Sequence, residues 1–373
     1  MKRRVLFWTD SFPPYIGGVE VLAAQYVRAM RAKGYEFVIV TRYEGDELVS
    51  RDDFEGVPLY RLNVRAALSS RSPLQLLQLR RAISEVAREF APDLLHIYHV
   101  GMGAMLFDGL RNIPRLLTLH SPIAAEHLVP NSALSTLLES VDYVACCSRS
   151  VAQDLWELAP TFRGRSSAIS NTLEMPDLQP TPISFEPPRL LALGRLVEAK
   201  GFDVAIEAFA ALKPRFPSLQ MTIAGNGPAF DDLNRLVESK GLQDSIAMPG
   251  WVAPEEVPKL ISAHTLTVMP SRIREAFGLV ALQAAQMARP VVASRLGGIP
   301  EVVEDGVSGA LVEPDDVEGF GTAIESLLRE PEKAAEMGIR ARERALTRFT
   351  WPVHVAAYDE LMQQLTANRN ESR

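Results

Sequence analysis

Two cations in the second half of the chain stand where they could bind a phosphate group. Arg195 and Lys200 lie in a short segment, residues 194–201, directly after an apolar run at 190–193. An arginine offers a planar fork of donors and a lysine a compact charge, so together they could neutralise a diphosphate and stabilise it as a leaving group. A solvated loop with an ion pair to Glu198 explains the same residues equally well. The segment alone leaves both interpretations open.

A carboxylate precedes the start of an apolar helix further along the chain. Glu275 lies in a loop that follows an apolar run and leads into a helix near Gly278. The first amides of a helix lack acceptors within the helix and carry the positive end of its dipole, so this helix start could bind an anion. Glu275 could accept hydrogen bonds from sugar hydroxyls, or it could be a favourable charge beside the helix N-terminus. Local physics favours the second role.

Glycine pairs follow predicted strands at two places. Gly17 and Gly18 come after the first apolar run and precede a helix that we expect to begin near Val19, whereas Gly297 and Gly298 follow a later run. Because glycine has no Cβ, a ligand can approach its backbone closely. A tight turn uses glycine for a different reason, and for the later pair alone a turn is the favoured interpretation.

Histidines also stand at the ends of predicted strands. His120 follows the apolar run 116–119, at the edge of the sheet where α/β proteins bind ligands. A lone histidine more often satisfies a nearby backbone group, and we favour that explanation on the residue alone. His96 and His99 lie in a similar place, but no metal-ligand spacing relates them to each other or to a carboxylate. The sequence therefore predicts no bound metal and no cofactor.

Short apolar runs alternate with helix-length amphipathic segments, which is typical of parallel sheets flanked by helices. The expected strands form two series, 4–8, 36–41, 94–98, 115–119 and 143–147, then 190–193, 220–224, 246–249, 266–269 and 291–293. Residues 176–188 contain five prolines, which disfavour helix and sheet and predict a domain linker. A terminal helix is expected from Trp351 to Gln364. The fold class is α/β, with two doubly wound halves.

The composition excludes several classes of protein. The 373 residues exceed what one core usually organises, and 47% hydrophobic with 23% charged residues is typical of globular proteins. The net charge of −7 disfavours general nucleic-acid binding, which depends on basic patches. The chain shows neither a transmembrane span nor a complete signal-peptide core. Its only cysteines, Cys146 and Cys147, are adjacent and poorly placed to pair, so a cytoplasmic location is expected.

Taken together and in this order, six segments resemble the family 4 glycosyltransferases of the GT-B fold. The segments are residues 13–20, His120, residues 194–201, residues 225–228, residues 275–283 and residues 297–301. Single glycine loops are common, but six ordered segments at strand ends are not expected by chance. The resemblance implies two Rossmann-like domains around a deep cleft, an acceptor-side domain at 1–178 and a nucleotide-sugar-binding domain at 189–350. It also implies a crossover helix, at about 351–373, that packs back on the first domain.

The resemblance also implies roles for individual residues. Arg195 and Lys200 would bind the donor diphosphate, Glu275 would contact the transferred sugar, and His120 would point at the sugar near the reacting carbon. These four are the expected catalytic residues. Further donor contacts would come from loop and helix-start positions, namely Gly17, Gly18, Gly194, Gly225, Gly227, Phe277, Gly278 and Leu279. No divalent ion would be needed, and the sugar would keep its anomeric configuration.

The chain departs from the family pattern at the ribose end of the donor site. The family has a second glutamate eight positions after the first, where this chain has Gln283. An amide oxygen still accepts a hydrogen bond but lacks the charge that strengthens it, so nucleotide affinity is in question more than chemistry. The loop between Ser271 and Glu275 has one extra residue relative to the commoner form. Trp251 could stack on the nucleotide base or could fill a corner of the core.

The acceptor side carries a basic segment. Residues 61–90 contain six arginines against two glutamates, Glu85 and Glu89, mixed with leucines on an expected helix. The arginines are Arg61, Arg65, Arg71, Arg80, Arg81 and Arg88. Such a surface could lie on anionic lipid and reach a lipid-linked acceptor, although a solvated helix face is the simpler explanation. The expected function is transfer of a hexose-type sugar from a UDP- or GDP-sugar to a glycan, lipid-linked or small-molecule acceptor. The alternatives are a nucleotide-sugar hydrolase, epimerase or phosphorylase on the same fold, or a catalytically silent nucleotide-sugar-binding subunit.

Overall fold

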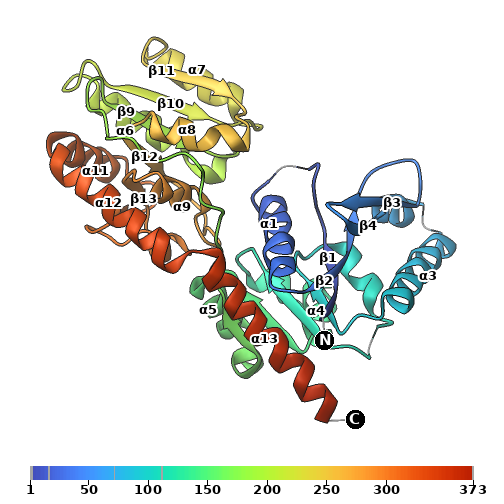
Figure 1. Cartoon of the computed structure of the whole chain (residues 1–373). Coiled ribbons are helices and arrows are strands. Elements are labelled where there is room, and N and C mark those ends of the chain that lie inside the picture. The colour runs from blue at the N-terminus through green and yellow to red at the C-terminus, as the bar shows by residue number, and fades with distance from the viewer. Residues whose placement is uncertain (1–2, 16, 71, 111, 372–373) are drawn as a thin grey trace. The chain divides into compact units, whose positions relative to one another are not determined.

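The computed structural model describes residues 3–15, 17–70, 72–110 and 112–371. The chain divides into two compact units, one made of Met1–Asn171 with Trp351–Arg373 and the other of Thr172–Thr350 (Figure 1). Each unit is a parallel-rich sheet with helices on its faces. None of the helices in these ranges is both long and apolar enough to cross a bilayer.

The first unit is built on a sheet in the order β3-β4-β2-β1-β5-β6-β7-β8. Its strands are β1 (Arg4–Thr9), β2 (Glu36–Arg42), β3 (Val49–Phe54), β4 (Val57–Leu62), β5 (Leu94–Ile97), β6 (Arg115–Leu119), β7 (Tyr143–Cys146) and β8 (Ser166–Ala168). Its α-helices are α1 (Gly18–Ala32), α2 (Val64–Ser69), α3 (Pro73–Phe90), α4 (Ala133–Ser140) and α5 (Arg149–Leu158). The short 3-10 helices are η1 (Met102–Phe107), η2 (Ala125–Leu128) and η3 (Pro160–Arg165). Only the β3–β4 pair among these neighbours is antiparallel. The central β1 is apolar at residues 5–8, as expected for a strand buried on both faces.

The last helix of the chain, α13 (Trp351–Glu371), belongs to this first unit (Figure 1). Its Tyr358 hydroxyl lies 3.0 Å from the Thr118 hydroxyl of β6, and Thr118 in turn contacts His96 Nε2 at 2.8 Å. At the rim, the Tyr35 hydroxyl donates to Asp359 at 2.7 Å. The helix that was expected at Trp351–Gln364 therefore continues to Glu371 and is fixed to the sheet by buried hydrogen bonds.

The second unit is a parallel sheet in the order β11-β10-β9-β12-β13-β14. Its strands are β9 (Arg189–Leu193), β10 (Gln220–Ala224), β11 (Ile246–Gly250), β12 (Leu266–Met269), β13 (Val291–Ser294) and β14 (Gly309–Val312). Its α-helices are α6 (Phe202–Leu212), α7 (Phe230–Ser239), α8 (Val257–Ser262), α9 (Leu279–Gln286), α10 (Ile299–Val302), α11 (Val317–Arg329) and α12 (Pro331–Arg348). Two short 3-10 helices are η4 (Glu198–Lys200) and η5 (Pro254–Glu256). From β9 the chain builds outward to β10 and β11, then returns to add β12 on the other side. The switch point, where α/β sheets bind ligands, is thus between β9 and β12.

The expected strands all form, each within one residue of its predicted ends. Four strands were not expected: β3, β4, β8 and β14. The sequence of β3 is largely polar and exposed, β8 has three residues, and β4 carries Pro58 near its start, so these three lack a continuous apolar run. The fourth, β14, is apolar but only four residues long. These strands lie at or near sheet edges, where burial on both faces is not required.

The division between the units lies earlier than the proline-rich segment 176–188 suggested. It falls between Asn171 and Thr172, so that segment belongs to the second unit. Gln286 of α9 donates to the Leu173 carbonyl at 3.2 Å, and Arg289 donates to the Thr181 carbonyl at 3.0 Å. The prolines therefore mark an extended strap that is bound to the second unit.

The basic segment 61–90 is not one helix. It contains the end of β4, then α2 and α3. The side chain of Arg61 on β4 is only 12% exposed, since it pairs with Asp52 and donates to the Pro13 carbonyl at 2.8 Å. Arg71 lies outside the described residues.

Candidate donor site

The loops after β9 and β12 meet at the switch point of the second unit. The Arg272 amide, in the loop after β12, donates to the Ala199 carbonyl of η4 at 2.9 Å. Lys200 and Glu275, which are 75 positions apart in sequence, are brought together because β9 and β12 are neighbours in the sheet. The two segments that the sequence singled out separately form one site.

Lys200 and Glu275 contact each other directly at this site. The Lys200 ammonium pairs with Glu275 Oε1, and the Ser271 hydroxyl donates to the same oxygen at 2.7 Å. The Glu275 side chain is 16% exposed and that of Lys200 is 32% exposed, so both groups can still reach a ligand. Glu275 is therefore the acceptor of two side-chain donors as well as a charge preceding a helix. Lys200 therefore pairs with Glu275 and not with Glu198, which forms no ion pair within the described part of the chain.

Arg272 fixes the loop that carries Glu275. Its guanidinium binds Asp203 through two nitrogens, at 2.6 Å and 2.5 Å, and contacts Asp315 at 2.5 Å. Hydrogen bonding to Asp203 raises the pKa of this arginine, so it stays charged. The bidentate pair joins the loop after β12 to the first turn of α6.

The later glycine pair supports the backbone of the Glu275 loop. The Gly298 amide donates to the Glu275 carbonyl at 2.8 Å. A Cβ added to Gly297 would lie 2.3 Å from that carbonyl oxygen, and one added to Gly298 would lie 2.4 Å from the Ala276 carbonyl oxygen. Gly297 and Gly298 form the turn that the sequence favoured, between β13 and α10. The close approach to residues 275–277 is an additional reason for both glycines.

A second close approach involves Gly225 and Gly227. Added Cβ atoms there would lie 1.8 Å from the Gly194 carbonyl oxygen and 2.2 Å from the Leu196 carbonyl oxygen. The Leu196 amide also donates to the Asn226 carbonyl at 2.9 Å. The backbone at Gly225 and Gly227 therefore packs directly against the start of the 194–201 segment, and these glycines are needed for that contact.

Other expected donor residues of the second unit lie on the same two loops and on α9. Arg195 is exposed, and its side chain forms no hydrogen bond or ion pair with another described residue. Phe277 is buried and stacks edge-on against Phe349, while Gly278 precedes the first residue of α9, Leu279. Gln283 is half-buried on the second turn of that helix. The N-terminus of α9 has no side-chain cap, so its first amides are available to an anion.

Trp251 follows β11 and is 56% exposed. The interpretation of this side chain as a filler of the core is therefore wrong. An exposed indole after a strand of the donor sheet remains suited to stacking on a planar ring.

In the first unit, His120 is buried at the end of β6 without a protein partner. Both ring nitrogens lack a hydrogen bond to any described residue, and the ring lies 4.4 Å from that of Tyr98. Burial, followed by the neighbouring His99, His354 and His96, lowers the pKa of His120 well below its usual value. The preferred explanation from sequence, a histidine satisfying a local backbone group, is wrong for His120. His96 differs from His120, because both nitrogens of its ring contact side-chain hydroxyls, those of Tyr26 at 3.2 Å and Thr118 at 2.8 Å.

Gly17 and Gly18 stand at the N-terminus of α1. Gly17 is the N-cap and lacks a side-chain cap, and Gly18 begins the helix. The Glu20 carboxylate folds back over this point, so that a Cβ on Gly17 would lie 2.4 Å from Glu20 Oε2. A ligand can approach the Gly17 backbone only if the Glu20 side chain moves away from it.

Sequence reasoning noted His99 at a strand end but missed Asp10 and Arg42, with which it forms a polar row along the carboxyl edge of the first sheet. Asp10 after β1, Arg42 at the end of β2 and His99 after β5 stand on neighbouring strands. Arg42 pairs with Asp10 at 3.3 Å, and Gly101 lies so close that an added Cβ would be 1.8 Å from Asp10 Oδ1. One His99 nitrogen is buried without a hydrogen-bond partner in the described part of the chain. The available signal was position alone, because single charged residues at strand ends form no motif.

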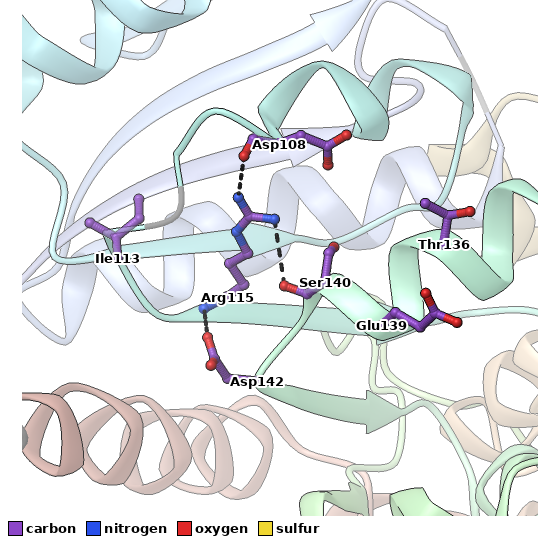
Figure 2. A pocket seen from close by; sticks show the side chains of 7 residues that line it. All are labelled: Asp108, Ile113, Arg115, Thr136, Glu139, Ser140 and Asp142. Atoms are coloured by element: carbon purple, nitrogen blue, oxygen red, sulfur yellow. Dashed lines mark hydrogen bonds between the residues drawn. The ribbon is translucent and has the colours of Figure 1, made fainter. Parts of the chain in front are cut away.

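A separate cavity of about 400 Å³ lies at the opposite, amino end of β6 (Figure 2). The buried Arg115 donates to the Phe107 and Asp108 carbonyls at 3.0 Å and 3.2 Å, and its amide donates to Asp142 at 2.7 Å. None of the predicted site residues lines this cavity. Arg115 joins β6 to the ends of η1 and α4, which is a structural role.

Metal ligands do not cluster in the described ranges. No group of three or more histidine, cysteine, aspartate or glutamate side chains there could hold an ion.

Comparison with known proteins identifies the family. The model of Glycosyl transferases group 1 matches residues 177–344, and that of Glycosyltransferase Family 4 matches residues 16–174. Glycogen synthase of Mycobacterium tuberculosis is 30% identical over 300 residues, which cover 76% of this chain and 71% of that protein. The GDP-mannose-dependent alpha-(1-6)-phosphatidylinositol monomannoside mannosyltransferase of Mycolicibacterium smegmatis is 35% identical over 192 residues, 50% of this chain. The match spans only 49% of the length of that mannosyltransferase.

The fold is shared with solved structures. Anabaena HepE in complex with UDP and glucose superposes with a TM-score of 0.77 at 21% identity, covering 96% of this chain and 99% of that one. Two Rossmann-like units of this kind define the GT-B class. The chain belongs to the group 1, family 4 glycosyltransferases.

Proposed function

We propose that this protein is a retaining glycosyltransferase that moves a hexose-type sugar from a UDP- or GDP-sugar to a glycan, lipid-linked or small-molecule acceptor. The observation that carries the proposal is the contact of Lys200 with Glu275 beside the uncapped N-terminus of α9. A cation and a helix N-terminus suit a diphosphate, and a carboxylate suits sugar hydroxyls. A nucleotide-sugar carries both groups, joined at the bond that must break.

The charge needed at the leaving group is supplied by the chain itself. In the proposal Lys200, the exposed Arg195 and the amides of Gly278 and Leu279 stabilise the negative charge that develops on the diphosphate. Interactions that strengthen as this bond breaks lower the barrier to transfer. The reaction therefore does not depend on a divalent ion. Retention of configuration is inferred from membership of the family.

The first unit provides the acceptor side. His120 has two unpartnered nitrogens for a sugar hydroxyl, and Asp10 and His99 could accept hydrogen bonds from acceptor hydroxyls. We keep both GDP- and UDP-sugars as candidate donors. The Mycolicibacterium smegmatis mannosyltransferase is named for GDP-mannose, and the Anabaena HepE structure holds UDP. Cell-envelope or glycoconjugate synthesis is the process that fits these relatives.

A peripheral membrane contact on the inner, cytoplasmic face is also proposed. Three leucines on α2 and α3 are exposed, Leu68 at 39%, Leu74 at 63% and Leu77 at 61%. Exposed arginines flank them: Arg65, Arg80, Arg81 and Arg88. Apolar side chains among cations favour an anionic lipid surface. Co-sedimentation with phosphatidylglycerol vesicles, compared between the wild type and the double variant Leu74→Ser/Leu77→Ser, tests this contact. Equal sedimentation of the two proteins would refute it.

The donor is identified by a thermal-shift panel of UDP, GDP, ADP and their sugars, since a ligand that binds only the folded protein raises its melting temperature. Product analysis with and without EDTA then separates transfer from hydrolysis, epimerisation and phosphorolysis. Arg195→Ala should lower turnover strongly, whereas Arg235→Ala, an exposed arginine of α7, should not. If none of these nucleotides or nucleotide-sugars raised the melting temperature of the wild-type protein, the proposed function would be refuted.

One observation supports a second candidate, a silent nucleotide-sugar-binding subunit. Gln283 stands where the family has an acidic residue. A subunit that binds the nucleotide-sugar without turning it over could lack that residue. A thermal shift with a nucleotide-sugar but no consumption of it over hours would favour this candidate.

A further inference from the structure

Two donors converge on one oxygen of Glu275. Ser271 Oγ lies 2.7 Å from Oε1, and Lys200 Nζ contacts the same atom. The other oxygen, Oε2, accepts no hydrogen bond from the described residues. A carboxylate held through one oxygen presents the second in a defined direction.

Ser271 is well placed to act as a fixed donor. Its side chain is 2% exposed, and it directly precedes Arg272, whose guanidinium is held by Asp203 and Asp315. The backbone beyond Glu275 is held by the Gly298 amide. Ser271 and Glu275 therefore stand on a loop that is fixed at both ends.

Lys200 cannot be an equally constant partner. Its ammonium is a single mobile charge at the end of a flexible stem, and in the proposed function it also serves the donor diphosphate. When Lys200 turns to the phosphate, Glu275 loses its cation, while the Ser271 hydroxyl stays in reach.

We propose that Ser271 is a positioning residue, which holds Glu275 Oε1 while Lys200 engages the diphosphate and thereby directs Oε2 at a hydroxyl of the transferred sugar. This inference rests on the proposed function. It assigns to Ser271 no contact with substrate and no proton transfer.

The kinetic test compares Ser271→Ala, Ser271→Thr and a matched control, Ser308→Ala. Ser308 is also 2% exposed, and its hydroxyl accepts from the Glu304 amide at 2.8 Å, away from Glu275. The donors are UDP-glucose or GDP-mannose, whichever the wild type consumes, and its four monodeoxy analogues. Ser271→Ala should lower kcat about ten-fold with little change in KM, Ser271→Thr should recover most of the loss, and Ser308→Ala should have no effect.

The analogues separate positioning from general damage. The loss of kcat in Ser271→Ala should vanish for the one analogue that lacks the hydroxyl bound by Glu275. With that analogue even the wild type forms no hydrogen bond to Oε2, so the direction of Oε2 no longer matters. An equal penalty on every analogue would overturn the inference, as would unchanged kcat in Ser271→Ala.

A crystallographic test does not require activity. In Lys200→Ala crystals Glu275 should keep its position, held by Ser271 alone, whereas in the Lys200→Ala/Ser271→Ala double variant its carboxylate should lose that position. A displaced Glu275 in the single variant, or an unmoved one in the double variant, would overturn the inference. Failure of the proposed function would instead appear as a wild type that consumes no nucleotide-sugar.

Discussion

The Arg272 guanidinium and the Asp203 carboxylate form two parallel hydrogen bonds, of 2.6 Å and 2.5 Å, between the loop after β12 and the start of α6. Paired bonds of this kind define orientation as well as charge. A lysine would keep the charge but lose the second bond.

Replacing Arg272 by lysine should therefore affect activity more than stability. The loop that carries Ser271 and Glu275 would gain freedom, and we expect kcat/KM for the nucleotide-sugar to fall by about three- to ten-fold. The pair is partly exposed, so the free energy of unfolding should fall by no more than about 1 kcal/mol. Steady-state kinetics and urea unfolding measure the two effects. Arg340→Lys, in an exposed pair on α12, is the control, and equal kcat/KM in both variants would contradict the prediction.

Alanine at Gly297 should be far more harmful than alanine at Gly241. Both glycines have left-handed backbones, with φ of 60° and 64°, so both substitutions share a cost of about 1 kcal/mol. Nothing lies within 4 Å of a Cβ on Gly241, whereas a Cβ on Gly297 would overlap the Glu275 carbonyl. We expect Gly297→Ala to lower the free energy of unfolding by about 3 kcal/mol and activity by about a hundred-fold. Similar urea midpoints for the two variants would show that the close approach is unimportant.

The turn at Gly297 and Gly298 was predictable from the sequence, but its close approach to residues 275–277 was not. The two segments are some twenty positions apart along the chain, and no local pattern relates them. The central strands were predictable for the opposite reason, because burial on both faces leaves a local apolar run such as residues 5–8. Edge strands such as β3 leave no such run.

The site was predictable in its parts but not in its connections. Arg195, Lys200 and Glu275 were found because ligand-binding residues follow the strands of α/β sheets. That Lys200 and Ser271 share one oxygen of Glu275 depends on β9 and β12 being neighbours, which is a property of the folded sheet. Asp10 and Arg42 pair across β1 and β2 for the same kind of reason.

Restoring the family's glutamate at position 283 should tighten nucleotide binding. A carboxylate accepts stronger hydrogen bonds from ribose hydroxyls than an amide oxygen does, so we expect Gln283→Glu to lower the Kd for UDP or GDP by about five-fold. Isothermal titration calorimetry measures the change. Gln243→Glu, which adds the same charge at an exposed position between α7 and β11, should leave the Kd unchanged. Weaker nucleotide binding by Gln283→Glu would mean that the side chain at position 283 of α9 does not accept hydrogen bonds from the ribose.

Acid should destabilise the first unit through its buried histidines. Burial lowers the pKa of His96 to about 3 and that of His354 to about 4, and it lowers the pKa of His120 as well. The unfolded chain, with histidine pKa values near 6.5, binds protons below that pH while the folded chain does not, so stability is lost as the pH falls. Between pH 7.5 and 5, His96 and His354 should each remove about 2 kcal/mol from the free energy of unfolding, and His120 should act in the same direction. Urea unfolding across this range measures the slope. His354→Gln should reduce the slope by about one proton, whereas the exposed His127→Gln should not, and a slope independent of His354 would show that this histidine is protonated in the folded state.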